Sequence, residues 1–238
     1  MRAVAIIPAR GGSKRIPGKN VKLFAGRPMI GRSIELALRA GCFDRVVVST
    51  DCDRIADIAL GFGAEVPFVR PPALADDHTP MLSVVSHALA SLGYQGNDLA
   101  CCICATAPLL VAEDLLRGRA ALVDSDADFS VSVTTFPFPI QRAVRVTASG
   151  RLAMFDPNSY LTRSQDLEET YHDAAQFYWG RARAFLEEQH IFGNGTIPVA
   201  IPRYRVQDID TVEDWLKAEA MYKSLSELGL LDANRFSG

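Results

Sequence analysis

The chain has 238 residues, 48% of them hydrophobic, and a formal net charge of −3 at pH 7. A chain of this size buries a sufficient core without disulfide or metal staples. No apolar run reaches the roughly 18–20 residues that span a bilayer, and no charged leader precedes an apolar segment. We therefore expect a cytoplasmic protein with no membrane partner. The slightly acidic balance gives no general attraction to nucleic acid.

Short apolar runs alternate with helical patterns over the first 135 residues. The sequence predicts strands at 4–8, 45–49, 65–69, 99–105 and 129–135, and helices at 29–40, 53–60, 79–92 and 113–123. Strands that alternate with helices form right-handed βαβ units, so the expected fold class is α/β, a mostly parallel sheet with helices on both faces. Thr79 is expected to cap its helix and Pro80 to occupy the first turn.

The alternation breaks after residue 135. Residues 136–170 contain Pro137, Pro139 and Pro157 with several turn signals, which indicates an excursion of hairpins and loops outside the sheet. Ordered structure is expected to resume at 176–179, followed by a helix near 181–188, a strand near 197–200 and a final helix from about 211. No internal repeat divides the chain, so we expect one domain over 1–238 that includes this excursion.

Three of the five cysteines lie together, at Cys101, Cys102 and Cys104. A zinc site would need a second ligand pair at suitable spacing, and the sequence has none. The surrounding segment is apolar and strand-like, which favours buried, reduced thiols in a core strand. Alternation along that strand puts Cys102 and Cys104 on one face and Cys101 on the other.

A cationic loop over residues 9–20 follows the first strand. Residues 1–45 contain ten Lys or Arg residues against two acidic ones, so positive charge is concentrated at this end. The loop is neither a P-loop nor a dinucleotide fingerprint, which disfavours an NAD-dependent dehydrogenase. Paired glycines expose backbone amides to an anion, and the polar side chains add hydrogen bonds and charge. The residues concerned are Arg10, Gly11, Gly12, Ser13, Lys14 and Lys19. The loop therefore favours phosphate binding over a merely solvated basic turn.

Two carboxylates, Asp208 and Asp210, precede the last helix. Residues i and i+2 of an extended segment point the same way, so both side chains can face one point. Paired carboxylates near phosphates commonly hold Mg²⁺. The alternative is that Asp210 or Thr211 only caps the helix. The phosphate-binding loop favours the metal interpretation.

Four segments resemble the CMP-sialic acid synthetase (acylneuraminate cytidylyltransferase) family, in order along nearly the whole chain. They are residues 7–20, 48–51, 70–77 and 208–211. The resemblance implies a nucleotide-diphospho-sugar transferase fold that binds CTP, Mg²⁺ and an acidic nine-carbon sugar. It also implies a homodimer in which the excursion packs on the neighbouring subunit.

Some features are most similar to the pseudaminic acid cytidylyltransferase branch of that family. They are Arg15, where sialic acid enzymes usually have glycine, and the segments 105–108, 162–166 and 171–180. Two departures are Ala175, where glycine is expected, and Met81, which leaves no serine base near the sugar. The expected activity is transfer of CMP from CTP to pseudaminic acid, with N-acetylneuraminate or legionaminate as alternative sugars. A non-catalytic nucleotide sensor is a more distant alternative.

The resemblance and the motifs together assign roles to individual residues. Arg10, Lys19, Asp208 and Asp210 are the expected catalytic residues, the last two as Mg²⁺ ligands. The nucleotide is expected to contact Ala9, Arg10, Gly11, Gly12, Ser13, Lys14, Lys19, Asn20, Asp51 and Arg70. The sugar is expected to contact Gln165, His172, Asp173, Gln176, Phe177 and Tyr178.

Overall fold

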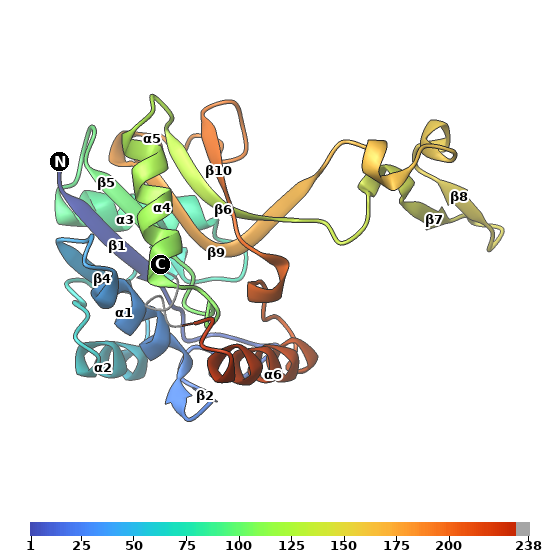
Figure 1. Ribbon diagram of the computed structural model, residues 1–238. Coiled ribbons are helices and arrows are strands. Elements are labelled where there is room, and N and C mark those ends of the chain that lie inside the picture. The colour runs from blue at the N-terminus through green and yellow to red at the C-terminus, as the bar shows by residue number, and fades with distance from the viewer. Residues whose placement is uncertain (232–238) are drawn as a thin grey trace.

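The computed structural model describes residues 1–231 and is built around a six-stranded sheet (Figure 1). The strand order is β10–β6–β9–β5–β1–β4. The strands are β1 (Ala3–Pro8), β4 (Arg45–Ser49), β5 (Leu99–Ile103), β6 (Phe129–Thr135), β9 (Tyr171–Arg181) and β10 (Thr196–Ala200). Strand β9 is antiparallel to both of its neighbours and the other pairings are parallel. The mostly parallel α/β sheet expected from the sequence is confirmed.

Helices cover both faces of the sheet because the buried strands carry apolar side chains on both sides. Helices α1 (Met29–Ala40), α2 (Asp53–Gly61) and α4 (Ala112–Val123) pack on one face, and α3 (Met81–Leu92) and α5 (Ala182–Leu186) on the other. Strand β5 follows the predicted alternation, since Cys101 and Cys102 belong to opposite clusters. All five cysteines are free thiols.

A third, smaller core joins the two ends of the chain. It packs the first loop and the short hairpin of β2 (Leu23–Phe24) and β3 (Arg27–Pro28) against α6 (Val212–Glu227) and the residues just before it. Its members are Ile16, Phe24, Met29, Ile209, Trp215 and Ala218. The Phe24 and Trp215 rings meet edge to face, with centroids 5.4 Å apart. This apolar contact holds the 9–20 loop beside the segment that carries Asp208 and Asp210.

Residues 136–170 leave the sheet between β6 and β9 and project from the body of the molecule (Figure 1). This excursion contains the two-stranded sheet of β7 (Val144–Val146) and β8 (Leu152–Met154). Three single-turn 3₁₀ helices accompany it, namely η2 (Ile140–Arg142), η3 (Pro157–Ser159) and η4 (Ser164–Asp166). Two more 3₁₀ turns lie in the body, at η1 (Pro72–Leu74) and η5 (Arg203–Arg205).

Two local predictions are wrong. The strand expected at 65–69 is reduced to a single bridge between Val47 and Glu65, because Pro67 interrupts the ladder and Val69 faces solvent. Helix α3 begins at Met81 after Pro80, and Thr79 does not cap it. The Thr79 hydroxyl donates instead to Asp76, at 2.7 Å.

Within residues 1–231, every helix is too short or too polar to cross a membrane.

Candidate active site

The 9–20 loop is held in shape by backbone geometry and by one distant carboxylate. Gly18 has φ of 63°, in the left-handed region that favours glycine. The Gly11 amide donates to Asp51 at 2.9 Å, and a Cβ at Gly11 would lie 2.9 Å from the Cβ of Cys52. The predicted role of this amide is therefore corrected, because Asp51 already occupies it. Gly12 is exposed, and a Cβ added there would meet nothing within 4 Å, so this part of the loop is open to solvent.

Asn20 and Lys19 connect the loop to its surroundings. The Asn20 side-chain amide donates to the Arg10 carbonyl at 3.0 Å, which braces the start of the loop. The Lys19 ammonium donates to the Ile209 carbonyl at 2.6 Å and lies 3.5 Å from the Asp210 carboxylate. Arg15 also reaches Asp210, at 2.9 Å. The cationic loop and the acidic pair therefore meet on one side of the molecule.

The acidic segment is fixed by the start of α6. Thr211 caps this helix in a capping box with Asp214, whose carboxylate also accepts the Asp210 amide at 3.1 Å. Since Thr211 and Asp214 supply the cap, the side chains of Asp208 and Asp210 are left for other partners. Burial is the main cause of a raised pKa at Asp208. The charge of Asp210 raises this pKa further, and the charge of Lys19 lowers it. Asp210 is therefore paired with Arg15 and Lys19, whereas burial makes the charged form of Asp208 less favourable than it is in water.

A cavity of about 290 Å³ opens beside the loop, at the carboxyl ends of β1 and β5. Its walls include Pro8, Arg10, Ser13, Lys19, Asn20, Arg70, Leu74, Asp76, Asp77, Thr79, Met81, Val84, Cys102, Cys104, Ala105 and Thr106. Parallel α/β sheets bind their ligands at this edge.

Arg70 is a buried wall of this cavity. Its guanidinium donates to the Ser49 hydroxyl at 3.1 Å and to the Ser49 carbonyl, so it is fixed to the end of β4. Burial lowers the pKa of Arg70 and the nearby Asp51 opposes this effect. Arg70 and Asp51 thus reinforce the turn after β4, and Arg70 also lines the cavity.

Asp77 binds two of the predicted phosphate cations. Its carboxylate forms ion pairs with Arg10 and, at 2.5 Å, with Lys14. Hydrogen bonds from Lys14 and from Arg10 lower the pKa of Asp77 to about 2.

Three of the predicted sugar-side residues, His172, Asp173 and Tyr178, lie around a bulge in β9. Strand register against β6 shifts between Val131 and Val133, and Ala175 there has φ of 51°. Glycine was expected at this position, and the left-handed backbone explains that preference. The Asp173 carboxylate accepts the Ala175 amide at 2.8 Å and the Tyr178 hydroxyl at 2.5 Å.

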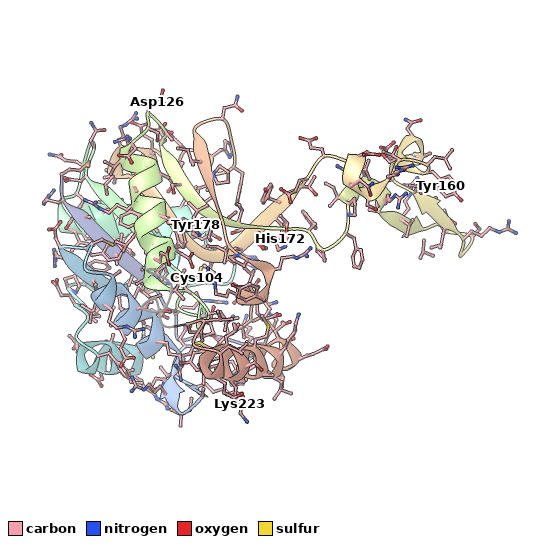
Figure 2. All side chains as sticks on the ribbon, in the orientation of Figure 1. Cys104, Asp126, Tyr160, His172, Tyr178 and Lys223 are labelled. Atoms are coloured by element: carbon pink, nitrogen blue, oxygen red, sulfur yellow. The ribbon has the colours of Figure 1, made fainter. Side chains whose placement is uncertain are left out.

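Cys104 lies next to Tyr178 in the view of Figure 2, and the charges of Asp173 and Asp208 both act on its thiol. The pKa of its thiol is raised to about 12, chiefly by burial and then by the charges of Asp173 and Asp208. His172 points toward the base of the excursion, where its ring packs edge-on against Phe136 at 4.8 Å.

Three predicted sugar residues lie elsewhere than expected. Phe177 is fully buried and packs against Gly118 of α4, where it cannot touch a ligand. Gln176 is 3% exposed, and its side-chain amide donates to the Arg205 carbonyl at 2.5 Å. Gln165 lies on the excursion in a separate hollow of about 320 Å³. The alternation of side chains along β9 points Phe177 into the core. Gln165 lies on the excursion, outside the body that contains the nucleotide cavity.

Several cavity residues escaped the sequence-based site prediction, notably Asp76, Asp77, Thr79, Cys104 and Thr106. Asp76, Asp77 and Thr106 lie in the segments 70–77 and 105–108 that resemble the family, but they were given no individual role. Their position at the carboxyl ends of predicted strands is the signal that could have assigned them to the site.

Cationic groups, a carboxylate pair and a cavity at the carboxyl edge of an α/β sheet define a nucleotide-dependent transferase site. A cytidylyltransferase family model matches residues 4–233, and the chain belongs to this family.

Two curated relatives cover most of both chains. The pseudaminic acid cytidylyltransferase of Campylobacter jejuni is 44% identical, over 94% of this chain and 97% of its own. The CMP-N,N'-diacetyllegionaminic acid synthase of Legionella pneumophila is 31% identical, over 93% and 96% respectively.

A solved structure has the same fold. It is a CMP:2-keto-3-deoxy-manno-octonic acid synthetase complexed with CTP, which covers 94% of this chain and 99% of its own with a TM-score of 0.70. Its sequence identity is 18%, so this likeness concerns the fold alone.

Proposed function

We propose that this cytidylyltransferase transfers CMP from CTP to the anomeric hydroxyl of pseudaminic acid and releases pyrophosphate. The observation that carries the proposal is the contact of Lys19 with Ile209 and Asp210, which joins the cationic loop to the acidic pair. The 44% identity to a relative of that activity supports the choice of base and sugar.

In this proposal the triphosphate lies along the 9–20 loop. Arg10 offers two parallel donors to phosphate oxygens, and Lys14 and Lys19 act as point charges. Gly12 and Ser13 add backbone and hydroxyl donors. Asn20, Asp51 and Arg70 brace the loop and the neighbouring turn, so the donors are positioned before the ligand arrives. Such preorganised charge is the main source of catalysis in phosphoryl-type transfer.

The acidic pair suits Mg²⁺ by its donor chemistry. Asp208 and Asp210 would hold the ion through the oxygen ligands that it prefers, and a bound cation would relieve the repulsion by which Asp210 raises the pKa of Asp208. Residues 1–231 contain no group of three acidic, histidine or cysteine side chains that could enclose a metal. Two carboxylates with water and phosphate oxygens fit the usual Mg²⁺ habit. Bound Mg²⁺ would neutralise phosphate charge and lower the pKa of a bound hydroxyl.

The reaction is an in-line displacement at the α-phosphorus. The anomeric oxygen forms the new bond to phosphorus as the bond to the pyrophosphate oxygen breaks, and the hydroxyl proton is released to solvent. Arg10 and Lys19 stabilise the charge that gathers on the leaving group, and the cavity walls orient both substrates.

Recognition of the sugar falls to the β9 bulge. The Asp173–Tyr178 pair lies near Cys104, which borders the nucleotide cavity. His172 contacts the Asp173 carbonyl and adds a polar ring beside this pair. A site that hydrogen-bonds hydroxyl and acetamido groups discriminates strongly, because a wrong substituent leaves a buried polar group unpaired.

We further propose a homodimer that forms through the excursion. Large apolar side chains are exposed there, among them Phe138, Val146, Leu152, Phe155 and Leu161. Exposed apolar patches of this kind mark protein interfaces. Gln165 also lies on the excursion, so in the dimer it would be carried toward the neighbouring subunit.

The test is pyrophosphate release with CTP and Mg²⁺ against three nine-carbon sugars. We expect pseudaminic acid to give the highest kcat/KM, with legionaminic and N-acetylneuraminic acids lower by about tenfold or more. A higher kcat/KM with either of the other sugars would reassign the substrate, and binding of CTP without turnover of any sugar would favour a nucleotide sensor.

A further inference from the structure

Asp77 neutralises the same cations that the proposed triphosphate needs. Its carboxylate is paired with Arg10 and Lys14. Arg10 and Asp77 line the cavity, and Lys14 reaches it through its ion pair with Asp77. The sequence-based scheme gave this carboxylate no role. A nucleotide that uses these two cations must first displace it.

The surrounding loop lets Asp77 move without unfolding. The neighbouring Asp76 holds the turn, because its carboxylate accepts the His78 amide at 2.9 Å, the Thr79 amide at 2.7 Å and the Thr79 hydroxyl at 2.7 Å. The Asp77 side chain keeps 30% of its surface exposed, and within residues 1–231 its carboxylate has Arg10 and Lys14 as its only partners. Turning this one side chain toward water therefore breaks no bond that maintains the turn.

Both ion pairs are exposed to solvent, so replacing the Asp77 carboxylate by another anion costs little free energy. Lys14 is 81% exposed and Arg10 is 32% exposed. Exposed pairs of this kind contribute little each, typically a factor of about 1.5 to 5 in an equilibrium constant. A polyphosphate brings more charge to the same cations than one carboxylate and can displace it.

We propose that Asp77 is an exchangeable counter-ion that sets the affinity of the loop for polyphosphates. It occupies Arg10 and Lys14 while the site is free of ligand, yields them to CTP, and takes them back as pyrophosphate leaves. The inference rests on the proposed function, because it assumes that the 9–20 loop binds the phosphates of CTP.

The test compares ligand binding by the full-length protein and its Asp77→Asn and Asp77→Ala variants. Calorimetry with CTP, inorganic pyrophosphate and cytidine at low ionic strength gives the three affinities. We expect both variants to bind CTP and pyrophosphate about three- to tenfold more tightly than the wild type. Cytidine carries no phosphate, so its affinity should stay within about twofold.

Asp128→Asn is the matched control. It removes an aspartate that pairs with an arginine, Arg183, at the amino-terminal end of β6, away from the cavity. We expect its affinities to match those of the wild type. In a Lys14→Met background, the gain from Asp77→Asn should shrink, because one of the two competed cations is gone.

Three outcomes would overturn the inference. These are weaker or unchanged binding of CTP and pyrophosphate by both variants, an equal gain for cytidine, and an undiminished gain in the Lys14→Met background. Binding of pyrophosphate but not CTP by the wild type would contradict the proposed function alone. Binding of neither ligand would contradict both.

Discussion

Lys19 is the residue that joins the two halves of the candidate site. Its backbone amide closes a turn with Ile16, and its ammonium reaches the Ile209 carbonyl and the Asp210 carboxylate. Ile16 and Ile209 both belong to the small core beneath α6. One apolar contact thus brings opposite charges from the two ends of the chain together.

Replacing Asp210 tests the acidic pair most simply. Asp210→Ala should lower turnover by about 10²–10³-fold, since it removes one of the two proposed metal ligands. Its ion pairs to Arg15 and Lys19 are partly exposed, so stability should change by about 1 kcal/mol at most. Pyrophosphate release and circular dichroism measure the two effects. A folded and fully active variant would remove Asp210 from the mechanism.

Ala175 occupies a backbone conformation that suits glycine. Its φ of 51° costs an L-residue about 1 kcal/mol, so Ala175→Gly should raise the free energy of unfolding by about 0.5–1 kcal/mol. Urea denaturation measures the change. A loss of stability would mean that the alanine methyl contributes more by packing than the backbone costs.

The sequence predicts which kinds of residue form the site better than it predicts which residues contact one another. The cationic loop, the acidic pair and the edge of the sheet all follow from local patterns. The partner of the Gly11 amide does not, because Asp51 lies 40 residues further along the chain. Asp77 escaped for the same reason, since its cations lie on a different loop. The roles assigned to individual site residues, and the cytoplasmic location, stay predictions.

At the scale of elements, a buried ion pair ties η5 to α4. Asp114 is 1% exposed and Arg205 is 8% exposed, and the Arg205 guanidinium donates to both carboxylate oxygens. The Arg205 carbonyl accepts from Gln176 of β9. The short chain from Arg205 to the acidic pair is therefore anchored to both a helix and the sheet.

Breaking this pair should strongly destabilise the protein. Asp114→Ala leaves the Arg205 charge buried, and the expected loss is about 3–5 kcal/mol in the free energy of unfolding. Arg183→Gln breaks the exposed pair with Asp128 instead, and should cost about 1 kcal/mol or less. Urea denaturation of both variants gives the comparison. Equal losses would contradict the distinction between buried and exposed pairs.

Most helices and parallel strands were predicted well, whereas β9, the strand expected at 65–69 and the start of α3 were not. Helix α1 and strands β4 and β6 have the predicted bounds, because apolar periodicity and glycine or turn residues mark their limits. Strand β9 was expected only at 176–179 and in fact covers Tyr171–Arg181. The bulge at Ala175 breaks its alternation. The antiparallel direction of β9 depends on where the excursion re-enters the sheet, and no local sequence pattern specifies this.

At the scale of the whole molecule, the excursion exposes an unusual amount of apolar surface to solvent. Figure 2 shows Tyr160 on this arm, far from the labelled residues of the body. Tyr160 and Leu161 line an apolar hollow of about 560 Å³ together with Val144 and Met154. The proposed dimer would bury this surface.

A charge placed on this surface should separate the subunits. Leu161 is 87% exposed, so Leu161→Asp should leave the fold of one subunit intact and convert a dimer to monomers. Sedimentation velocity measures the mass. Arg54→Asp, an exposed change on α2, is the control and should remain dimeric. A wild-type protein that sediments as a monomer would contradict the proposed dimer.

The central claim is that the loop at one end of the chain and the acidic pair at the other hold a single metal–triphosphate. Calorimetric titration of CTP with and without Mg²⁺ tests it, using the wild type and an Asp208→Asn, Asp210→Asn double variant. We expect Mg²⁺ to tighten CTP binding by the wild type and to have little effect on the variant, whose loop retains a weaker, metal-independent affinity. An equal effect of Mg²⁺ on both proteins would contradict it.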